Sequence, residues 1–201
     1  GLLERRLLAA HCITIPEADF AALAAHPFTA VIAPSACMRS GAAIAPLKAM
    51  RQAGINTALG TDNVANNNSY DLFKEMQLAG KLMSLREQEP SAIPAREIVE
   101  MATLGGARAL GLEHEIGSLE PGKKADLITL DLGEIGWSPR GGQDVYSALV
   151  YSVGGYHVRD VMVDGRWLLR DGRLTTLDYA LMSGGLDLAQ AELQRRVQAA
   201  G

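Results

Sequence analysis

Apolar residues in the first half of the chain gather in short runs that alternate with longer amphipathic stretches. Apolar runs with strand-forming residues cover 6–12, 29–33 and 56–60, and stretches with helical spacing cover 16–26, 45–54 and 69–87. Strands buried on both faces of a sheet form continuous apolar runs of this kind. The pattern therefore predicts three β/α units and a parallel sheet over residues 6–87. Ser69 is the expected N-cap of the last helix, and residues 35–43 are expected to form a polar loop.

The second half of the chain has a different character. A single helix is predicted over 95–112, after Pro94. Strands follow at 123–131, 157–164 and 166–170, and the Asp164-Gly165 pair between the last two is a strong hairpin signal. The tail is predicted to be helical with a break at the glycines 184–185. The chain is therefore divided into a β/α portion (1–112), a β-rich portion (113–175) and a helical tail (176–201).

Composition and charge narrow the function classes. The net charge of −4 and the pI near 5.6 lack the excess of positive charge that is typical of nucleic-acid-binding proteins, so no nucleic-acid partner is expected. No apolar run reaches the length of a membrane span, so no membrane partner is expected. Cys12 and Cys37 form neither a disulfide framework nor a Cys-x-x-Cys site, which favours a cytoplasmic location. Cys37 has no positioned base before it and is interpreted as a packed thiol rather than a nucleophile.

Polar residues follow the predicted strands at their carboxyl ends, where the catalytic groups of parallel sheets usually lie. His11 follows the first strand and Asp62 the third, and catalytic groups of such sheets lie at the carboxyl ends of strands. A lone histidine on an apolar strand is more often a core residue, and a lone aspartate more often a turn residue. Together they favour a metal-hydrolase pocket, where a carboxylate binds metal or accepts a proton and an imidazole moves protons. We expect the two side chains to share one cavity, within roughly 12 Å.

Three segments of the chain resemble a known family. They are "LLAAHC" (7–12), the stretch from "APSACMRSG" to "LGTDNVANNNSYDLFKEMQLAGKL" (33–82), and "IGSLEPGKKADLITLDL" (116–132). These segments resemble the C-terminal half of the amidohydrolase superfamily. The nearest branch holds the cyclic-amine deaminases and chlorohydrolases, including methylthioadenosine/S-adenosylhomocysteine deaminases. The Gly-Thr-Asp with its Asn-rich helix start and the "GSLEPGKKADL" entry are its two specific features.

The resemblance implies a fold, a reaction and a set of site residues. The fold would be α/β: the C-terminal half of a TIM-type (β/α)8 metal-dependent hydrolase barrel, with the three strands as strands six to eight, plus part of a small β-sandwich. His11 and Asp62 would be catalytic, and Asp62 would also bind one divalent metal ion (zinc, or else iron or manganese). Ser35 and Asn63 would bind the substrate, an aminated heterocycle such as an adenosine-type nucleoside.

The chain also departs from this family. It contains no His-x-His and no His-x-x-Glu, which in the family supply metal ligands and an acid from the first and fifth strands. His26, His114 and His157 have no partner at metal spacing and are expected to be structural or exposed. The sequence starts without Met, close to a strand, and is expected to be a fragment that is inactive alone.

Several alternatives stay open. The chain could represent a non-catalytic structural or regulatory relative on the same fold, or a chlorohydrolase of triazine-like rings. A nucleotide-binding βα domain is disfavoured, because no Gly-x-Gly-x-x-Gly follows a strand. The expected partners are a small heterocyclic substrate and further copies of the chain in a homo-oligomer.

Overall fold

The computed structural model describes residues 1–133, 142 and 144–200, and its contacts divide the chain into two compact units. The first unit comprises Gly1–Lys124 and Asp131–His157, and the second comprises Ala125–Leu130 and Val158–Gly201. The first unit therefore extends beyond the 1–112 portion expected from the sequence. Residues 134–141 and 143 of the expected β-rich portion lie outside the described residues.

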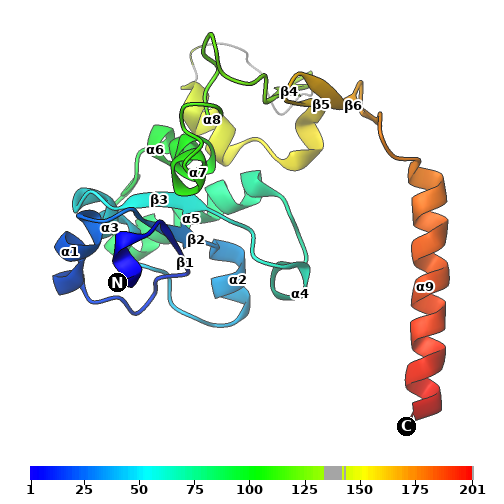
Figure 1. Cartoon of the computed structure of the whole chain (residues 1–201), viewed down its shortest axis with the longest axis horizontal. Coiled ribbons are helices and arrows are strands. Elements are labelled where there is room, and N and C mark those ends of the chain that lie inside the picture. The colour runs from blue at the N-terminus through cyan, green and yellow to red at the C-terminus, as the bar shows by residue number, and fades with distance from the viewer. Residues whose placement is uncertain (134–141, 143, 201) are drawn as a thin grey trace. The chain divides into compact units, whose positions relative to one another are not determined.

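A parallel sheet organises the first unit. Its strands are β1 (Leu7–Ala10), β2 (Phe28–Ile32) and β3 (Asn56–Leu59), with β2 in the centre (Figure 1). Leu7 pairs with Phe28, and Thr29 pairs with Asn56, both in parallel register. The central strand is almost wholly buried, which explains its continuous apolar run. The predicted parallel sheet over the first part of the chain is confirmed.

Short helices connect and follow these strands. They are η1 (Leu2–Glu4), η2 (Glu17–Asp19), α1 (Phe20–Ala24), α2 (Pro34–Arg39), α3 (Leu47–Gln52), α4 (Val64–Asn67) and α5 (Leu72–Glu87). The expectation of a loop over 35–43 was wrong in its first part, because α2 begins there. Pro34 suits the first turn of a helix, and the backbone N–H of Ser35 finds a carboxyl acceptor on Glu75.

The last of these helices begins two residues later than expected. Asp71, not Ser69, is the N-cap of α5, because its carboxylate accepts hydrogen bonds from the backbone N–H groups of Phe73 and Lys74. Ser69 instead accepts one from the backbone N–H of Asp71. An aspartate is as good a cap as a serine, so composition did not distinguish the two positions.

The core of the first unit lies between the sheet and its helices. Its fully buried apolar side chains are Ile32, Leu47, Met50, Met83, Ile93, Ile98, Met101 and Val150. Two further helices, α6 (Ala95–Ala102) and α7 (Leu104–Leu110), replace the single helix expected over 95–112. The break falls at Thr103, with φ −128° and ψ −93°. It lets α7 lie against β3 so closely that a Cβ on Gly105 would stand 2.4 Å from the carbonyl oxygen of Thr57. Helix α8 (Val145–Tyr151) and the turn η4 (Gly155–His157) complete the unit.

The second unit is an antiparallel sheet followed by a helix. The strands β4 (Leu127–Leu130), β5 (Val158–Val163), β6 (Arg166–Arg170) and β7 (Arg173–Leu174) pair in that order. Asp164 and Gly165 both have positive φ, as a two-residue hairpin turn requires, which confirms that prediction. Helix α9 (Tyr179–Ala200) runs without the interruption expected at its two glycines (Figure 1). None of the helices in the described part of the chain has the length and apolarity needed to cross a membrane.

Candidate active site

The three parallel strands end at one edge of the sheet, and the residues that follow them make the site. The backbone N–H of His11 donates to the carbonyl oxygen of Val31 at 2.8 Å, and that of Gly60 donates to Ile32 at 2.9 Å. These bonds continue the sheet ladder just past β1 and β3, so the two outer strand ends stay aligned with the central one. The site therefore lies at the hydrogen-bonded carboxyl ends of the three strands.

The backbone of both candidate catalytic residues adopts the left-handed conformation. The φ angle is +66° at His11 and +59° at Asp62, a region that few residues other than glycine, asparagine and aspartate enter readily. Their side chains meet, with His11 Nε2 at 3.6 Å from Asp62 Oδ2. The prediction that this pair lies at the same sheet edge and within roughly 12 Å is confirmed, while the cavity that they were expected to share stays a prediction.

Amide groups surround the Asp62 carboxylate. Oδ1 accepts hydrogen bonds from the backbone N–H of Asn63 at 2.6 Å and from its side chain at 3.1 Å, and Oδ2 accepts one from Asn66 Nδ2 at 3.0 Å. These donors, led by the Asn63 backbone, and the nearby His11 hold the pKa of Asp62 below its ordinary value. The asparagine-rich turn therefore keeps Asp62 ionised and able to accept a proton.

A thiol lies on the other side of the His11 ring. Cys37 Sγ is 3.7 Å from His11 Nδ1, while Nε2 faces Asp62. Burial raises the pKa of Cys37, and the negative charges of Asp62 and Glu75 raise it further, so the group remains a thiol. A protonated thiol can donate to Nδ1 and so favours the His11 tautomer that carries its proton on Nε2. The interpretation of Cys37 as a packed thiol stands, with a contact to the site in addition.

The two expected substrate-binding residues differ in their surroundings. Ser35 is buried in the first turn of α2, and within the described residues its Oγ has no hydrogen-bond partner. Asn63 is exposed and caps α4 through a 3.0 Å bond from the backbone N–H of Asn66 to Asn63 Oδ1. The Asn63 amide also donates to Asp62, so both ends of this side chain form hydrogen bonds within the turn. Substrate contact by either residue remains a prediction.

The model of the amidohydrolase family matches residues 1–168, which is most of the chain.

The chain belongs to the amidohydrolase family.

Relatives and solved structures agree with this assignment. A 5-methylthioadenosine/S-adenosylhomocysteine deaminase from Moorella thermoacetica is 41% identical over 178 residues, 89% of this chain and 41% of that protein. The crystal structure of an adenosine deaminase from Xanthomonas campestris with bound zinc has a TM-score of 0.91 and 33% identity, covering 97% of this chain and 44% of that one. Atrazine chlorohydrolase from Arthrobacter aurescens, complexed with zinc, has a TM-score of 0.80 and 25% identity, covering 90% of this chain and 40% of that one. The chain therefore spans less than half the length of these proteins.

The described residues do not bring together a complete set of ligands for the metal expected of an amidohydrolase. A catalytic zinc typically takes three protein ligands. Within the described residues, no three His, Cys, Asp or Glu side chains gather as a metal site. His26 and His114 are exposed, and His157 is buried with its Nδ1 accepting from the backbone N–H of Gly154. Metal binding by Asp62 stays a prediction.

Two buried residues of the site were missed by the sequence analysis. Glu75 on α5 is 0% exposed, and Asn67 at the end of α4 is 6% exposed. A glutamate next to Met76 on the apolar face of a helix was the available signal for Glu75. Asn67 could not be told from its asparagine neighbours, since its burial depends on how the turn folds.

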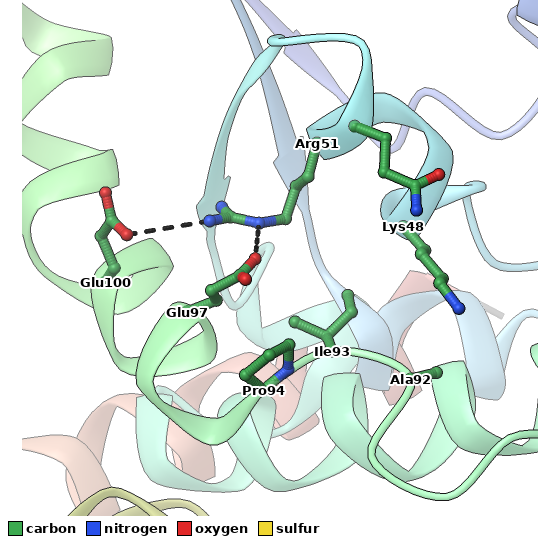
Figure 2. A pocket seen from close by; sticks show the side chains of 8 residues that line it. Lys48, Arg51, Ala92, Ile93, Pro94, Glu97 and Glu100 are labelled. Atoms are coloured by element: carbon green, nitrogen blue, oxygen red, sulfur yellow. Dashed lines mark hydrogen bonds and ion pairs between the residues drawn. The ribbon is translucent and has the colours of Figure 1, made fainter.

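A described pocket lies away from these residues. It measures about 570 Å³ and is lined by α3, α6 and the segment before α6 (Figure 2). Arg51 forms ion pairs with Glu97 at 2.6 Å and with Glu100 at 3.7 Å (Figure 2). Arg51 also donates a hydrogen bond to Thr57 Oγ1 at 2.7 Å. Thr57 lies near the amino end of β3, whereas Asp62 follows its carboxyl end. The cationic side chains that line this pocket are paired with carboxylates, Arg51 with Glu97 and Glu100, and Lys48 with Glu89, which indicates a structural ion-pair network rather than a catalytic site.

Proposed function

We propose that this chain is the C-terminal part of a metal-dependent hydrolase of non-peptide carbon–nitrogen bonds that deaminates an adenosine-type nucleoside. The observation that carries the proposal is the contact between His11 and Asp62 at the shared strand ends, with Asp62 held ionised by amide donors. The Moorella and Xanthomonas proteins, both deaminases of adenosine-type compounds by name, support the substrate class.

The reaction assigns a separate task to each residue. Water adds to the ring carbon that bears the amino group, the C–N bond then breaks, and ammonia leaves. Asp62 accepts the proton of the attacking water and returns it to the departing nitrogen. His11, oriented by the Cys37 thiol at Nδ1, has its Nε2 at 3.6 Å from Asp62 Oδ2, where it can carry a proton between Asp62 and the reacting groups. A metal ion bound in such a site would lower the pKa of the attacking water.

The barrel and its metal belong to the same proposal. The three strands would be strands six to eight of a (β/α)8 barrel, and within the described residues β1 and β3 have no strand on their outer sides. The small antiparallel sheet would be part of a β-sandwich. Asp62 would contribute one ligand to a single divalent ion, and the zinc in the two solved neighbours favours zinc. The remaining ligands would come from segments outside this chain.

Location and assembly complete the proposal. Both cysteines are buried and free, which supports a reducing cytoplasm. The open edges of β1 and β3 support self-association of the 201-residue chain alone, and a homo-oligomer of the complete protein is part of the proposal on general grounds only.

A protein of the relatives' full length that contains this chain tests the proposal. We expect it to release ammonia from adenosine, 5′-methylthioadenosine or S-adenosylhomocysteine, and Asp62→Asn to abolish measurable turnover without loss of the fold. A positioned acid–base group contributes about 10²- to 10⁴-fold. An unchanged rate in Asp62→Asn would make Asp62 a turn residue only.

The second candidate is hydrolysis of a chlorinated triazine ring. The likeness to the Arthrobacter chlorohydrolase favours it. Atrazine belongs in the same substrate panel: chloride release without deamination of any nucleoside would select this alternative. No turnover of any substrate by a zinc-loaded protein would instead support a non-catalytic relative.

A further inference from the structure

Glu75 is the most deeply buried ionisable side chain near the site, and the proposed chemistry does not use it. It lies on α5, on the face that carries Met76 and Ala79 into the core, and it is 0% exposed. Buried acidic groups are rare and costly unless they are hydrogen-bonded. The partners of Glu75 therefore indicate why the position is acidic.

Each oxygen of Glu75 binds a different loop of the site. Oε2 accepts a hydrogen bond from the backbone N–H of Ser35 at 2.9 Å, in the first turn of α2 just after β2. Oε1 accepts one from Asn67 Nδ2 at 2.8 Å, at the end of α4 after β3. One carboxyl group thus joins the segments that follow two neighbouring strands.

Asn67 passes this connection on to the residue before Asp62. Its Nδ2 also donates to the carbonyl oxygen of Thr61 at 2.7 Å, so both hydrogens of the amide are used. The Thr61 carbonyl belongs to the peptide that enters Asp62, whose φ is +59°. Fixing that carbonyl fixes the orientation of the peptide and hence the direction in which the Asp62 side chain leaves the backbone.

We propose that Glu75 is a positioning residue for Asp62, acting through Asn67 and the Thr61 carbonyl while its second oxygen anchors Ser35. The inference rests on the proposed function in that Asp62 is the group whose position matters. Displacement of a reacting group by about 1 Å costs on the order of 10²-fold in rate. The link therefore has a catalytic consequence beyond its contribution to stability.

The hydrogen-bond inventory makes Glu75→Gln a sharp test. The glutamine can accept from only one of the two donors, because its other end is an NH2 group. If that NH2 faces Asn67, the Asn67 amide must flip to present Oδ1, and Thr61 then loses its donor. If it faces Ser35, two N–H groups oppose each other. Either arrangement breaks one of the hydrogen bonds that connect Ser35, Glu75, Asn67 and Thr61, while the size of the side chain is preserved.

A double variant separates positioning from stability. In Glu75→Gln/Asn67→Asp, the glutamine can accept from Ser35 and donate to the new carboxyl group, so the contact between positions 75 and 67 is restored. The aspartate has no N–H for the Thr61 carbonyl, so the hydrogen bond between position 67 and Thr61 stays broken. Glu97→Gln is the matched control, since Glu97 is also a hydrogen-bonded carboxyl group but pairs with Arg51 away from the site.

The measurements are kcat, KM, thermal midpoint and zinc dissociation constant in the full-length protein. For Glu75→Gln we expect kcat to fall about 10- to 100-fold with KM changed less than about threefold, and zinc to bind about tenfold more weakly. The double variant should recover part of the thermal midpoint but not kcat or zinc affinity, and Glu97→Gln should leave kcat and zinc affinity unchanged. Recovery of kcat together with the midpoint, or a normal kcat in Glu75→Gln, would overturn the proposal.

Hydrogen exchange in the 201-residue chain keeps the inference separate from the proposed function. Both variants should speed exchange of the backbone N–H of Asn63, which bonds to Asp62 Oδ1, at least tenfold while leaving β2 unchanged. If the wild-type protein deaminates nothing, the proposed function fails, yet this exchange still tests Glu75. Unchanged exchange at Asn63 in both variants would refute the link even in an active enzyme.

Discussion

His11 Nε2 lies 3.6 Å from Asp62 Oδ2, although the two residues follow the outer strands of the sheet and β2 runs between them. Both residues have a left-handed backbone, His11 directly after β1 and Asp62 three residues after the end of β3. The pair therefore depends on the alignment of all three strand ends.

The first prediction concerns His11. In the full-length protein, His11→Gln should lower kcat about 10²-fold, the lower range for a positioned acid–base group, because glutamine cannot carry a proton in transit. His26→Gln, at an exposed position, is the control and should leave kcat unchanged. Equal rates for the two variants would remove His11 from the mechanism.

The second prediction concerns the Cys37 thiol. Because burial and the nearby carboxylates raise its pKa, little thiolate forms at pH 8, and thiolate is the reactive species. Iodoacetamide should modify Cys37 in the folded 201-residue chain at least tenfold more slowly than in urea, with the rate still rising at pH 9. Peptide mapping by mass spectrometry would measure the rate of alkylation at Cys37. Rapid alkylation at pH 7 would show a lowered pKa instead.

The third prediction concerns acid stability. The pKa of Asp62 lies below its ordinary value of 3.8, so the folded state favours the charged form. That stabilisation is complete above the ordinary pKa and is lost as pH falls through the lower pKa of the folded state. The difference in urea midpoint between the wild type and Asp62→Asn should therefore shrink between pH 7 and pH 3. A difference that grows on acidification would contradict the direction of the shift.

The fourth prediction concerns metal. The 201-residue chain should retain well under one equivalent of zinc after dialysis, because one carboxylate cannot replace the three ligands that a catalytic zinc typically takes. Elemental mass spectrometry on the purified chain is the measurement. A protein of full length should retain the ion, and Asp62→Asn should weaken its binding. One full equivalent on the short chain would require ligands other than those proposed.

The fifth prediction concerns association. An unpaired strand edge is a template for another chain, and β1 carries the half-exposed Leu8. We expect the 201-residue chain to form oligomers in sedimentation velocity, and Leu8→Lys to shift the distribution toward monomer. Val145→Lys, at an exposed apolar side chain on α8, is the matched control. A monodisperse monomer at all concentrations would show that the edge is protected.

Sequence reasoning succeeded where one local signal determined the structure. Continuous apolar runs identified β2 and its neighbours, and Asp164-Gly165 identified the hairpin, because burial on two faces and positive φ each restrict residue choice strongly. Asp62 was found because it directly follows a strand. These features depend on residues close together in the chain.

The features that were missed depend on distant partners. Helix α2 forms where a loop was expected because Glu75, far along the chain, satisfies its first turn. The break at Thr103 reflects the close approach of Gly105 to β3, and no pattern within 95–112 reports that contact. Conversely, the two glycines of α9 were given too much weight, since each costs a helix only about 1 kcal/mol and does not force a break.

The left-handed backbone at position 62 also restricts what evolution can place there. Glycine, asparagine and aspartate tolerate this conformation, while β-branched and longer side chains are strained in it. Glutamate would keep the charge but would suit the turn poorly and place its carboxyl group one methylene further out. A lineage that abandoned the chemistry should therefore drift to asparagine or glycine at this position, and the residue found there in distant homologues would record whether the ancestral activity had been kept.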